Sequence, residues 1–266
     1  MLTYEALIDQ AKLKGIPQTK ARGILREYLQ ILILKEIYRT KLGKKLYFTG
    51  GTYLRLVHNL KRFSEDLDFN TNSITNREFE LLLQKVKNEL KRVGLELQVT
   101  FAHWQNIYLS KLIFHGIEKA YNVVSKYSKK AGIIIKVETN KPKWNITTET
   151  EVISGFGELY PCICTERGTL FADKIDALCK KSRGRHLFDI MFMITNKYPI
   201  NRDILKVLGI VKDPREVITE RVKEFSKNEL KKQAENLRPC LFDETEAELV
   251  LNAHKIIPVL INKCQS

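Results

Sequence analysis

The segment around residue 50 restricts the fold of this chain more than any other part of the sequence. Residues 44–48 (KKLYF) predict a short strand, which runs directly into a glycine turn at residues 49–52 (TGGT). The next residues, TYLRLVHNL, carry apolar side chains at the spacing typical of a helix. A second strand is predicted at residues 66–70 (DLDFN). This order of strand, turn, helix and strand predicts an α/β fold with a site at the turn.

The turn and the second strand together suggest phosphate chemistry. Gly50 and Gly51 allow the backbone to approach a phosphate closely and offer N–H groups at the start of a helix. Asp66 and Asp68 are two residues apart on a strand, so their carboxylates share one face. Two such carboxylates can hold two divalent cations about 3.5–4 Å apart, which suits nucleotide transfer from a nucleoside triphosphate. The alternative is that both are polar positions on a half-buried strand.

A third carboxylate ends the strand predicted at residues 132–139 (GIIIKVET). Glu138 shares one face of that strand with Ile134 and Lys136, opposite the apolar face. It could complete a metal site or act as a general base. It could equally be a charge that faces water and pairs with Lys136, so both interpretations stay open.

Two charged residues of the C-terminal half are expected on the apolar, buried faces of helices. Lys174 lies within the apolar stripe of the helix predicted at residues 167–182, so it must reach water or meet an anion such as a triphosphate. Asp189 is the only polar side chain in residues 187–194 and needs a partner if buried. Asp189 could orient Lys174, and the candidate partners are Lys174, Arg183 and Arg185.

The charge of the chain favours a polyanionic partner. Its 266 residues include 45 Lys and Arg against 31 Asp and Glu, a formal net charge of +14. Nucleic acid, an anionic membrane or an acidic protein would fit, although a lysine-rich surface also serves solubility.

No apolar run approaches the roughly 18 residues of a membrane span, and the N-terminal stretch is no signal peptide, so a cytoplasmic protein is expected. Free thiols are expected at Cys162, Cys164, Cys179, Cys240 and Cys264.

The periodicity divides the chain into an α/β part, residues 1–160, and a mostly helical part, residues 161–266. Strands are predicted at 44–48, 66–70, 95–101, 106–114 and 132–139. Helices are predicted at 3–14, 18–41, 52–60, 76–93, 167–182, 186–197, 201–209, 214–235 and 243–263.

Four motifs in this order resemble a known family. The stretches YFTGGTYLRL, RFSEDLDF, TLFADKIDAL and RGRHLFDIMFMI, within residues 47–194, resemble the AbiEii-type nucleotidyltransferase toxins, including the MenT toxins, of the DNA polymerase beta superfamily. The resemblance implies a polymerase-beta-type core with a mixed sheet, and a helical C-terminal region that completes the active site. His186 departs from the closest pattern, which usually has Asp at this place.

The resemblance also implies roles for individual residues. Mg²⁺, or Mn²⁺, would bind Asp66 and Asp68, with Glu138 as the candidate third ligand, and Asp189 would be the essential acid of the last motif. The residues implied to bind the NTP are Gly50, Gly51, Thr52, Arg55, Arg62 and Lys174.

The implied biology is that of a toxin in a type IV toxin–antitoxin or phage-defence system. Such a toxin would move an NMP from an NTP to the 3′ end of tRNA, block aminoacylation and be restrained by a separate antitoxin protein. Two alternatives are a nucleotidyltransferase with a small-molecule or protein acceptor, and a non-catalytic RNA-binding protein. The charge of +14 argues against a small-molecule acceptor, and the intact Asp66, Asp68 and Lys174 argue against loss of catalysis.

Overall fold

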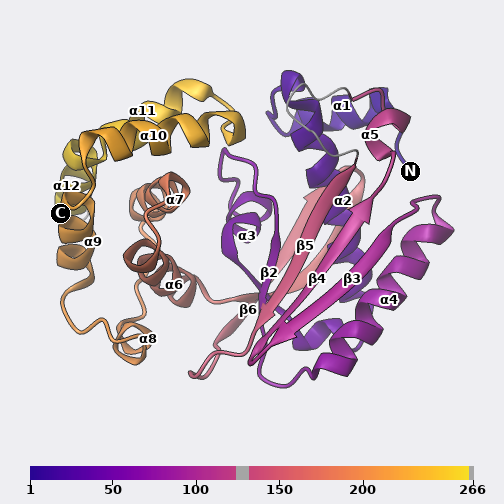
Figure 1. Cartoon of the computed structure of the whole chain (residues 1–266), viewed down its shortest axis with the longest axis horizontal. Coiled ribbons are helices and arrows are strands. Elements are labelled where there is room, and N and C mark those ends of the chain that lie inside the picture. Colours follow the sequence, from indigo (N-terminus) through magenta and orange to yellow (C-terminus); the bar gives the residue numbers. More distant parts are fainter. Residues whose placement is uncertain (124–131, 264–266) are drawn as a thin grey trace. The chain divides into compact units, whose positions relative to one another are not determined.

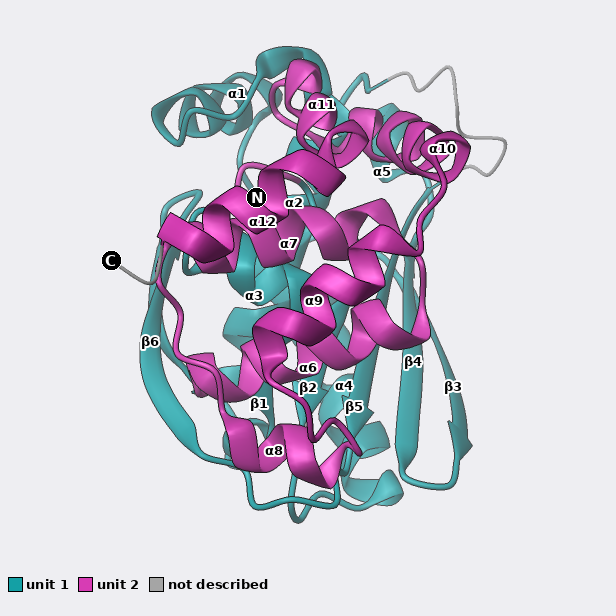
Figure 2. Cartoon of the chain, turned by 90° about the vertical axis from the view of Figure 1, so that its left-hand side faces the viewer, with its two compact units in different colours: residues 1–59, 63–164 teal, residues 60–62, 165–266 magenta. Residues whose placement is uncertain are grey.

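The computed structural model describes residues 1–123 and 132–263, which form two compact units (Figure 2). The first unit comprises residues 1–59 and 63–164, and the second comprises residues 60–62 and 165–266. The chain therefore enters the second unit briefly at residues 60–62 before it passes into it at residue 165.

A seven-stranded mixed sheet forms the centre of the first unit, in the order β3-β4-β5-β2-β1-β7-β6. Two strand pairs are parallel, β2 with β5 and β1 with β7, and the pairs β1–β2, β3–β4 and β4–β5 are antiparallel. This confirms the α/β class and the mixed sheet. The strands are β1 Tyr47–Thr49, β2 Leu67–Asn70, β3 Gln98–Trp104, β4 Ile107–Phe114, β5 Ile133–Asn140, β6 Thr148–Gly155 and β7 Glu158–Thr165.

Helices α2 and α4 pack on each other and on one face of this sheet (Figure 1). Ile133, Ile135 and Val137 of β5 are fully buried on that face, and the Tyr108 ring of β4 lies 6.1 Å from the Phe79 ring of α4. The alternate residues of β3, β4 and β5 point to the other face and are exposed or half-buried. The helices of the first unit are α1 Tyr4–Leu13, α2 Ala21–Tyr38, α3 Gly50–Leu56, α4 Asn76–Arg92 and α5 Ile117–Ala120.

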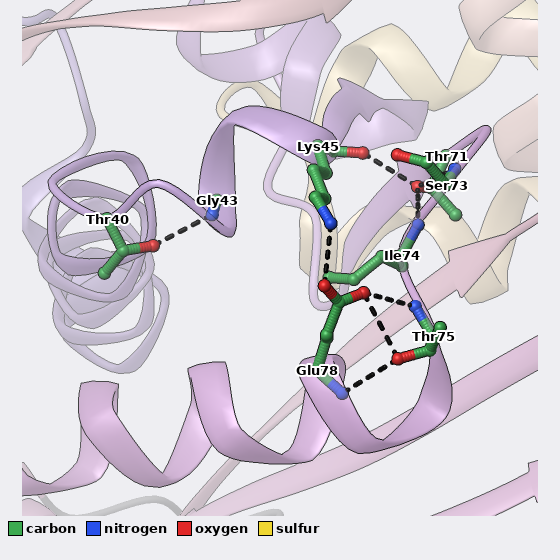
Figure 3. Close-up of polar contacts among 8 residues, drawn as sticks. All are labelled: Thr40, Gly43, Lys45, Thr71, Ser73, Ile74, Thr75 and Glu78. Atoms are coloured by element: carbon green, nitrogen blue, oxygen red, sulfur yellow. Dashed lines mark hydrogen bonds and ion pairs between the residues drawn. The ribbon is translucent and has the colours of Figure 1, made fainter.

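A polar network fixes the two strands that carry the predicted site (Figure 3). Before β1, the Lys45 ammonium donates to Glu78 at 2.7 Å, and the Lys45 carbonyl accepts from the Thr71 hydroxyl at 2.8 Å. Glu78 also accepts from the Thr75 N–H, which closes the capping box of α4. The start of β1, the end of β2 and the start of α4 are thereby tied together.

The second unit is helical. Residues 60–62 join it through an antiparallel bridge between Arg62 and Leu241 and a hydrogen bond from the Phe242 N–H to the Lys61 carbonyl, 3.1 Å long. Its helices are α6 Arg167–Lys180, α7 Gly184–Thr195, α8 Arg202–Val207, α9 Pro214–Lys223, α10 Lys227–Leu237, α11 Ala247–Leu251 and α12 Ala253–Lys263.

Several elements differ from the predicted ones. The helix predicted at 243–263 is divided into α11 and α12, and α5 is additional. The strand expected at 95–101 begins at Gln98, because Gly94 and Leu95 close the end of α4 with N–H bonds to Lys91 and Leu90. The helix expected at 214–235 is divided, because Ser226 caps a new helix: its hydroxyl accepts the Glu229 N–H, and its own N–H donates to the Glu229 carboxylate. Strands β6 and β7 are additional to the predicted ones.

Candidate functional site

The glycine turn lies against the aspartate strand. β1 ends at Thr49 and α3 begins at Gly50, whose φ of +82° is in the left-handed region. A Cβ on Gly50 would lie 2.3 Å from Oδ2 of Asp68, closer than any real contact. Glycine is therefore required here both by the backbone conformation and by the closeness of the carboxylate.

The register of the sheet places two carboxylates side by side. Asp68 of β2 is the Cα partner of Glu138 in the parallel β2–β5 ladder and of Thr49 in the antiparallel β1–β2 ladder. Paired residues of neighbouring strands point to the same face, with backbones about 4.8 Å apart. Asp66 precedes β2 by one residue, and all three acidic side chains are half-buried. Leu67 of β2 is fully buried on the opposite face.

Thr52 connects the turn to this strand. Its hydroxyl donates to the main-chain carbonyl of Asp66, and the residue is fully buried. The family resemblance implies a triphosphate contact for Thr52, which stays a prediction, and in the structure the hydroxyl points to the aspartate strand. Thr52 therefore positions Asp66 relative to the turn.

Thr49 lies at the candidate site, although the sequence did not indicate it. It is buried beside Asp68 in the ladder, and its hydroxyl oxygen has no hydrogen-bond partner among the described residues. Buried hydroxyls normally have a partner, so this one marks a place where a ligand oxygen or water would be accommodated.

The donor set at the sheet suits a hard cation. Carboxylate oxygens are the ligands of Mg²⁺, which usually binds one or two of them together with substrate phosphates rather than a closed protein cage. Across residues 1–123 and 132–263, no three His, Cys, Asp or Glu side chains form a cluster that could hold a metal. Asp66 and Asp68, with substrate oxygens, fit the Mg²⁺ pattern better than a preformed three-carboxylate cage.

Arg55 lies in the interior of the first unit. Its Nε and Nη2 donate to the two carboxylate oxygens of Glu27 on α2, at 2.8 and 3.1 Å, and both side chains are only 2% exposed. Its Nη1 donates to Oδ1 of Asn59 at 3.1 Å. These contacts give the guanidinium a structural role in holding α3 on α2. The phosphate contact that the family resemblance implies for Arg55 stays a prediction.

A buried ionic cluster occupies the second unit. Asp189 of α7 is completely buried and accepts from Nε and Nη2 of Arg62, at 2.7 and 2.8 Å, and from Nζ of Lys174 on α6, at 2.7 Å. Burial alone would raise the pKa of Asp189, but the charges of Arg62 and Lys174 hold that pKa well below its usual range. The carboxylate is therefore ionised, and it fixes both cations.

This cluster assigns partners to three predicted site residues. Lys174 is buried as its place in the apolar stripe suggests, and it pairs with Asp189. The second partner is Arg62, for which the family resemblance implies a phosphate contact. The helix that carries Lys174 begins at a cap, because the Glu166 carboxylate accepts the N–H groups of Gly168 and Thr169 at the start of α6.

His186 lies beside the cluster on α7. It is buried, and neither ring nitrogen has a hydrogen-bond partner within the part of the chain that the structure describes. Burial lowers the pKa of His186 to about 3, and the positive charge of Lys174 contributes to this shift while Asp189 opposes it. The imidazole is therefore neutral at physiological pH.

The fold resembles those of two solved structures over almost the whole chain. MenT4, a nucleotidyltransferase toxin from Mycobacterium tuberculosis H37Rv, matches with a TM-score of 0.61 and 15% identity, covering 100% of this chain and 92% of that one. JHP933 from Helicobacter pylori matches with a TM-score of 0.58 and 18% identity, covering 92% and 94%. Identities this low establish the fold alone. No curated protein sequence matches the chain.

The family assignment comes from the sequence itself. The family model described as "Nucleotidyl transferase AbiEii toxin, Type IV TA system" matches residues 32–245, well over half of the chain, and this range contains the glycine turn, both aspartates, Lys174 and Asp189. Within the described ranges, no helix has the length and apolarity that crossing a membrane requires. The chain belongs to the AbiEii family of nucleotidyltransferase toxins of type IV toxin–antitoxin systems.

Proposed function

We propose that this protein transfers an NMP from an NTP to the 3′-hydroxyl of an RNA, with tRNA as the acceptor and Mg²⁺, or Mn²⁺, as the required cation. One observation carries the proposal. The β2–β5 register sets Asp68 next to Glu138 on one sheet face, while Gly50 brings the turn against the same aspartate.

The reaction needs a nucleophile, a leaving group and a place for one proton. The 3′-oxygen of the acceptor forms a bond to the α-phosphorus, the bond from that phosphorus to the β-phosphate oxygen breaks, and pyrophosphate leaves. Asp66 and Asp68 would hold the cation, which neutralises phosphate charge and lowers the pKa of the attacking hydroxyl when bound. Glu138 would either complete the ligand set or accept the hydroxyl proton.

Lys174 is the proposed phosphate contact. An ammonium group has three N–H donors, and the structure uses one of them for Asp189. Its side chain remains 10% exposed, so an anion can reach it. Asp189 acts here as a positioning residue, because its carboxylate holds the ammonium in one place. The nucleotide contacts that the resemblance implies for Thr52, Arg55 and Arg62 remain part of the proposal, beside the internal contacts that these side chains make.

The proposed acceptor agrees with the net charge of +14, since a tRNA is a polyanion. Addition of nucleotides to its 3′ end would block aminoacylation and stop translation. A separately encoded antitoxin would restrain this activity, and defence against phage is the proposed biological role. Growth arrest on expression, relieved by the neighbouring gene, and reduced phage yield in cells that carry both genes would test this part.

The test of the chemistry uses purified protein, total tRNA and each α-labelled NTP in turn, with Mg²⁺, Mn²⁺ or EDTA. Asp66→Asn and Asp68→Asn should each reduce transfer by more than about 100-fold. Removal of a residue that only hydrogen-bonds to a metal ligand already lowers metal affinity or activity 10–100-fold. Asp9→Asn, a change of the same charge at an exposed position of α1, is the control and should retain full transfer.

The acceptor is tested separately with periodate-oxidised tRNA, which lacks the 3′ diol and should receive no label. Equal labelling of oxidised and intact tRNA would contradict a 3′-hydroxyl nucleophile. Label in protein or in a small molecule, with none in RNA, would change the acceptor class. Binding of RNA with no transfer from any NTP would indicate a non-catalytic protein.

A further inference from the structure

The sheet face that carries Asp68 and Glu138 continues across β4 and β3, where its described side chains are exposed or half-buried. Asp68, Glu138, Leu109 and Ala102 form one cross-strand row, given by the registers of β2–β5, β4–β5 and β3–β4. Leu109 is half-buried and Ala102 is exposed, while the alternate residues of β4 are mostly buried under α4 on the opposite face. The face is therefore an accessible surface of the first unit that begins at the proposed catalytic carboxylates.

Two lysines oppose each other on this face. Lys111 of β4 and Lys136 of β5 are direct Cα partners in the antiparallel ladder, and both are exposed. Neither has a carboxylate partner among the residues that the structure describes. Like charges that lie directly opposite each other on a sheet are destabilising. The pair therefore places concentrated positive charge where an anion would relieve the repulsion.

The lysines lie close to the carboxylate row. They occupy the next row of this face, two residues from Glu138 and Leu109 along their strands. With strands about 4.8 Å apart and residues about 3.4 Å apart, their Cα atoms lie roughly 8 and 12 Å from that of Asp68. The charge is thus beside the proposed metal site rather than on a remote part of the protein.

Apolar and aromatic side chains complete the surface. Ile113 and Ile134 are direct partners in the row beyond the lysines, and both are half-buried. On the other side of the carboxylate row, Trp104 at the end of β3 pairs with Ile107 and is 52% exposed. Proteins that bind single-stranded nucleic acid often use a sheet of this kind: bases stack on its exposed aromatic rings, and its basic residues contact the phosphates.

We propose that this face, defined by Trp104, Leu109, Lys111, Ile113, Ile134 and Lys136, binds the single-stranded 3′ segment of the RNA acceptor. Lys111 and Lys136 contact its phosphates, and Trp104 stacks on a base. The inference rests on the proposed function in that it assigns the acceptor subsite of the same reaction. An acidic protein would also be attracted by the lysines, but it would gain less from the exposed indole and from continuity with the carboxylates that act on the 3′ end.

Binding is measured without catalysis, so that this inference and the proposed function can fail independently. The probe is a 5′-labelled RNA hairpin with a single-stranded 3′ end, titrated in EDTA without NTP at several salt concentrations. Lys111→Gln/Lys136→Gln should weaken binding and reduce the slope of log K against log salt by about 1.4, since each phosphate contact on a single strand contributes about 0.7. Removal of the opposed charges should leave the thermal midpoint unchanged or higher.

The matched control is Lys85→Gln/Lys87→Gln, which removes the same charge from α4 on the opposite side of the sheet. The control should keep the parent slope. Equal slopes for the parent and the Lys111/Lys136 variant would overturn the proposal, even if the parent transfers nucleotides. Loss of RNA binding in that variant would support it, even if no transfer is found.

Two further measurements distinguish the nature of the ligand. In a Trp144→Phe background, the fluorescence of Trp104 should be quenched on RNA binding, and Trp104→Ala should lower RNA affinity about tenfold. A poly-glutamate peptide serves as the probe for an acidic protein. If the Lys111/Lys136 variant loses poly-glutamate binding and keeps RNA binding, the face is a protein-docking surface and the proposal is wrong.

Discussion

Replacement of Asp189 by asparagine is expected to destabilise the helical unit more than any change of a surface charge. The carboxylate is fully buried and lies 2.7–2.8 Å from nitrogens of Arg62 and Lys174. Asparagine keeps the shape but removes the negative charge from between two cations. Removal of one partner from a buried ion pair costs about 3–5 kcal/mol.

Urea unfolding followed by far-UV circular dichroism measures this cost. With a slope of about 2 kcal/mol per molar urea, the midpoint should fall by roughly 1.5–2.5 M. Trp104 and Trp144 both lie in the first unit, so their fluorescence reports on that unit alongside the helical signal. Asp176→Asn is the control. Its half-buried carboxylate pairs with the exposed ammonium of Lys180 one turn further along α6, and removal of this pair should cost less than about 0.5 kcal/mol.

The pH dependence provides a second check on the same residue. The pKa of Asp189 is lower in the folded protein than its usual value of 3.8, because of Arg62 and Lys174. Its contribution to stability is therefore complete above about pH 4 and is lost as the pH falls below that value. The difference between parent and Asp189→Asn midpoints should be constant from about pH 5 to 8 and shrink in acid. Equal midpoints at pH 7 would refute the buried-pair argument.

Three other changes have defined outcomes. Lys174→Gln should raise the KM for the NTP in the labelling assay, and an unchanged KM would remove Lys174 from the phosphate site. Gly50→Ala should abolish transfer and destabilise the protein, because the added Cβ would clash with the Asp68 carboxylate. Gly94→Ala is the control: its φ of +85° is equally unfavourable for alanine, but no atom lies near the added Cβ. It should lower stability through backbone strain alone and keep full transfer. The pKa of His186 is lowered to about 3, so the free energy of unfolding should fall by up to about 1.4 kcal/mol for each pH unit below pH 6.5. His186→Leu should remove this dependence, which urea midpoints between pH 5 and 7 would measure.

Local periodicity accounts for what the sequence predicted about the site. Alternation along β2 places Leu67 and Phe69 in the core, which leaves Asp68 on the other face. Helical periodicity places Lys174 in the buried stripe of α6, where the structure has it. Both patterns depend only on neighbours within a few residues, so they can be read from one segment.

The partners of these residues could not be predicted in the same way. Arg62 and Asp189 are 127 residues apart, and nothing in either segment indicates that the arginine joins the helical unit. The Arg55–Glu27 pair is similarly a tertiary contact between two helices. Other differences had visible signals, such as the Ser226-x-x-Glu229 capping box that divides the predicted helix.

The difference in burial among the acidic residues assigns them different chemistry. A cation reaches a carboxylate more readily when that carboxylate keeps some exposed surface, because Mg²⁺ keeps several of its waters when it binds. Asp189 has no exposed surface and both of its oxygens accept hydrogen bonds from cations, so a metal would have to displace an ion pair whose loss costs about 3–5 kcal/mol. Asp66 and Asp68 are half-buried on a sheet face that is accessible beyond Glu138, which makes them the proposed ligands. The essential acid that the family resemblance places at Asp189 is therefore better explained as the group that holds Lys174, and loss of activity in Asp189 variants should accompany a higher KM for the NTP and an unchanged dependence on Mg²⁺ concentration.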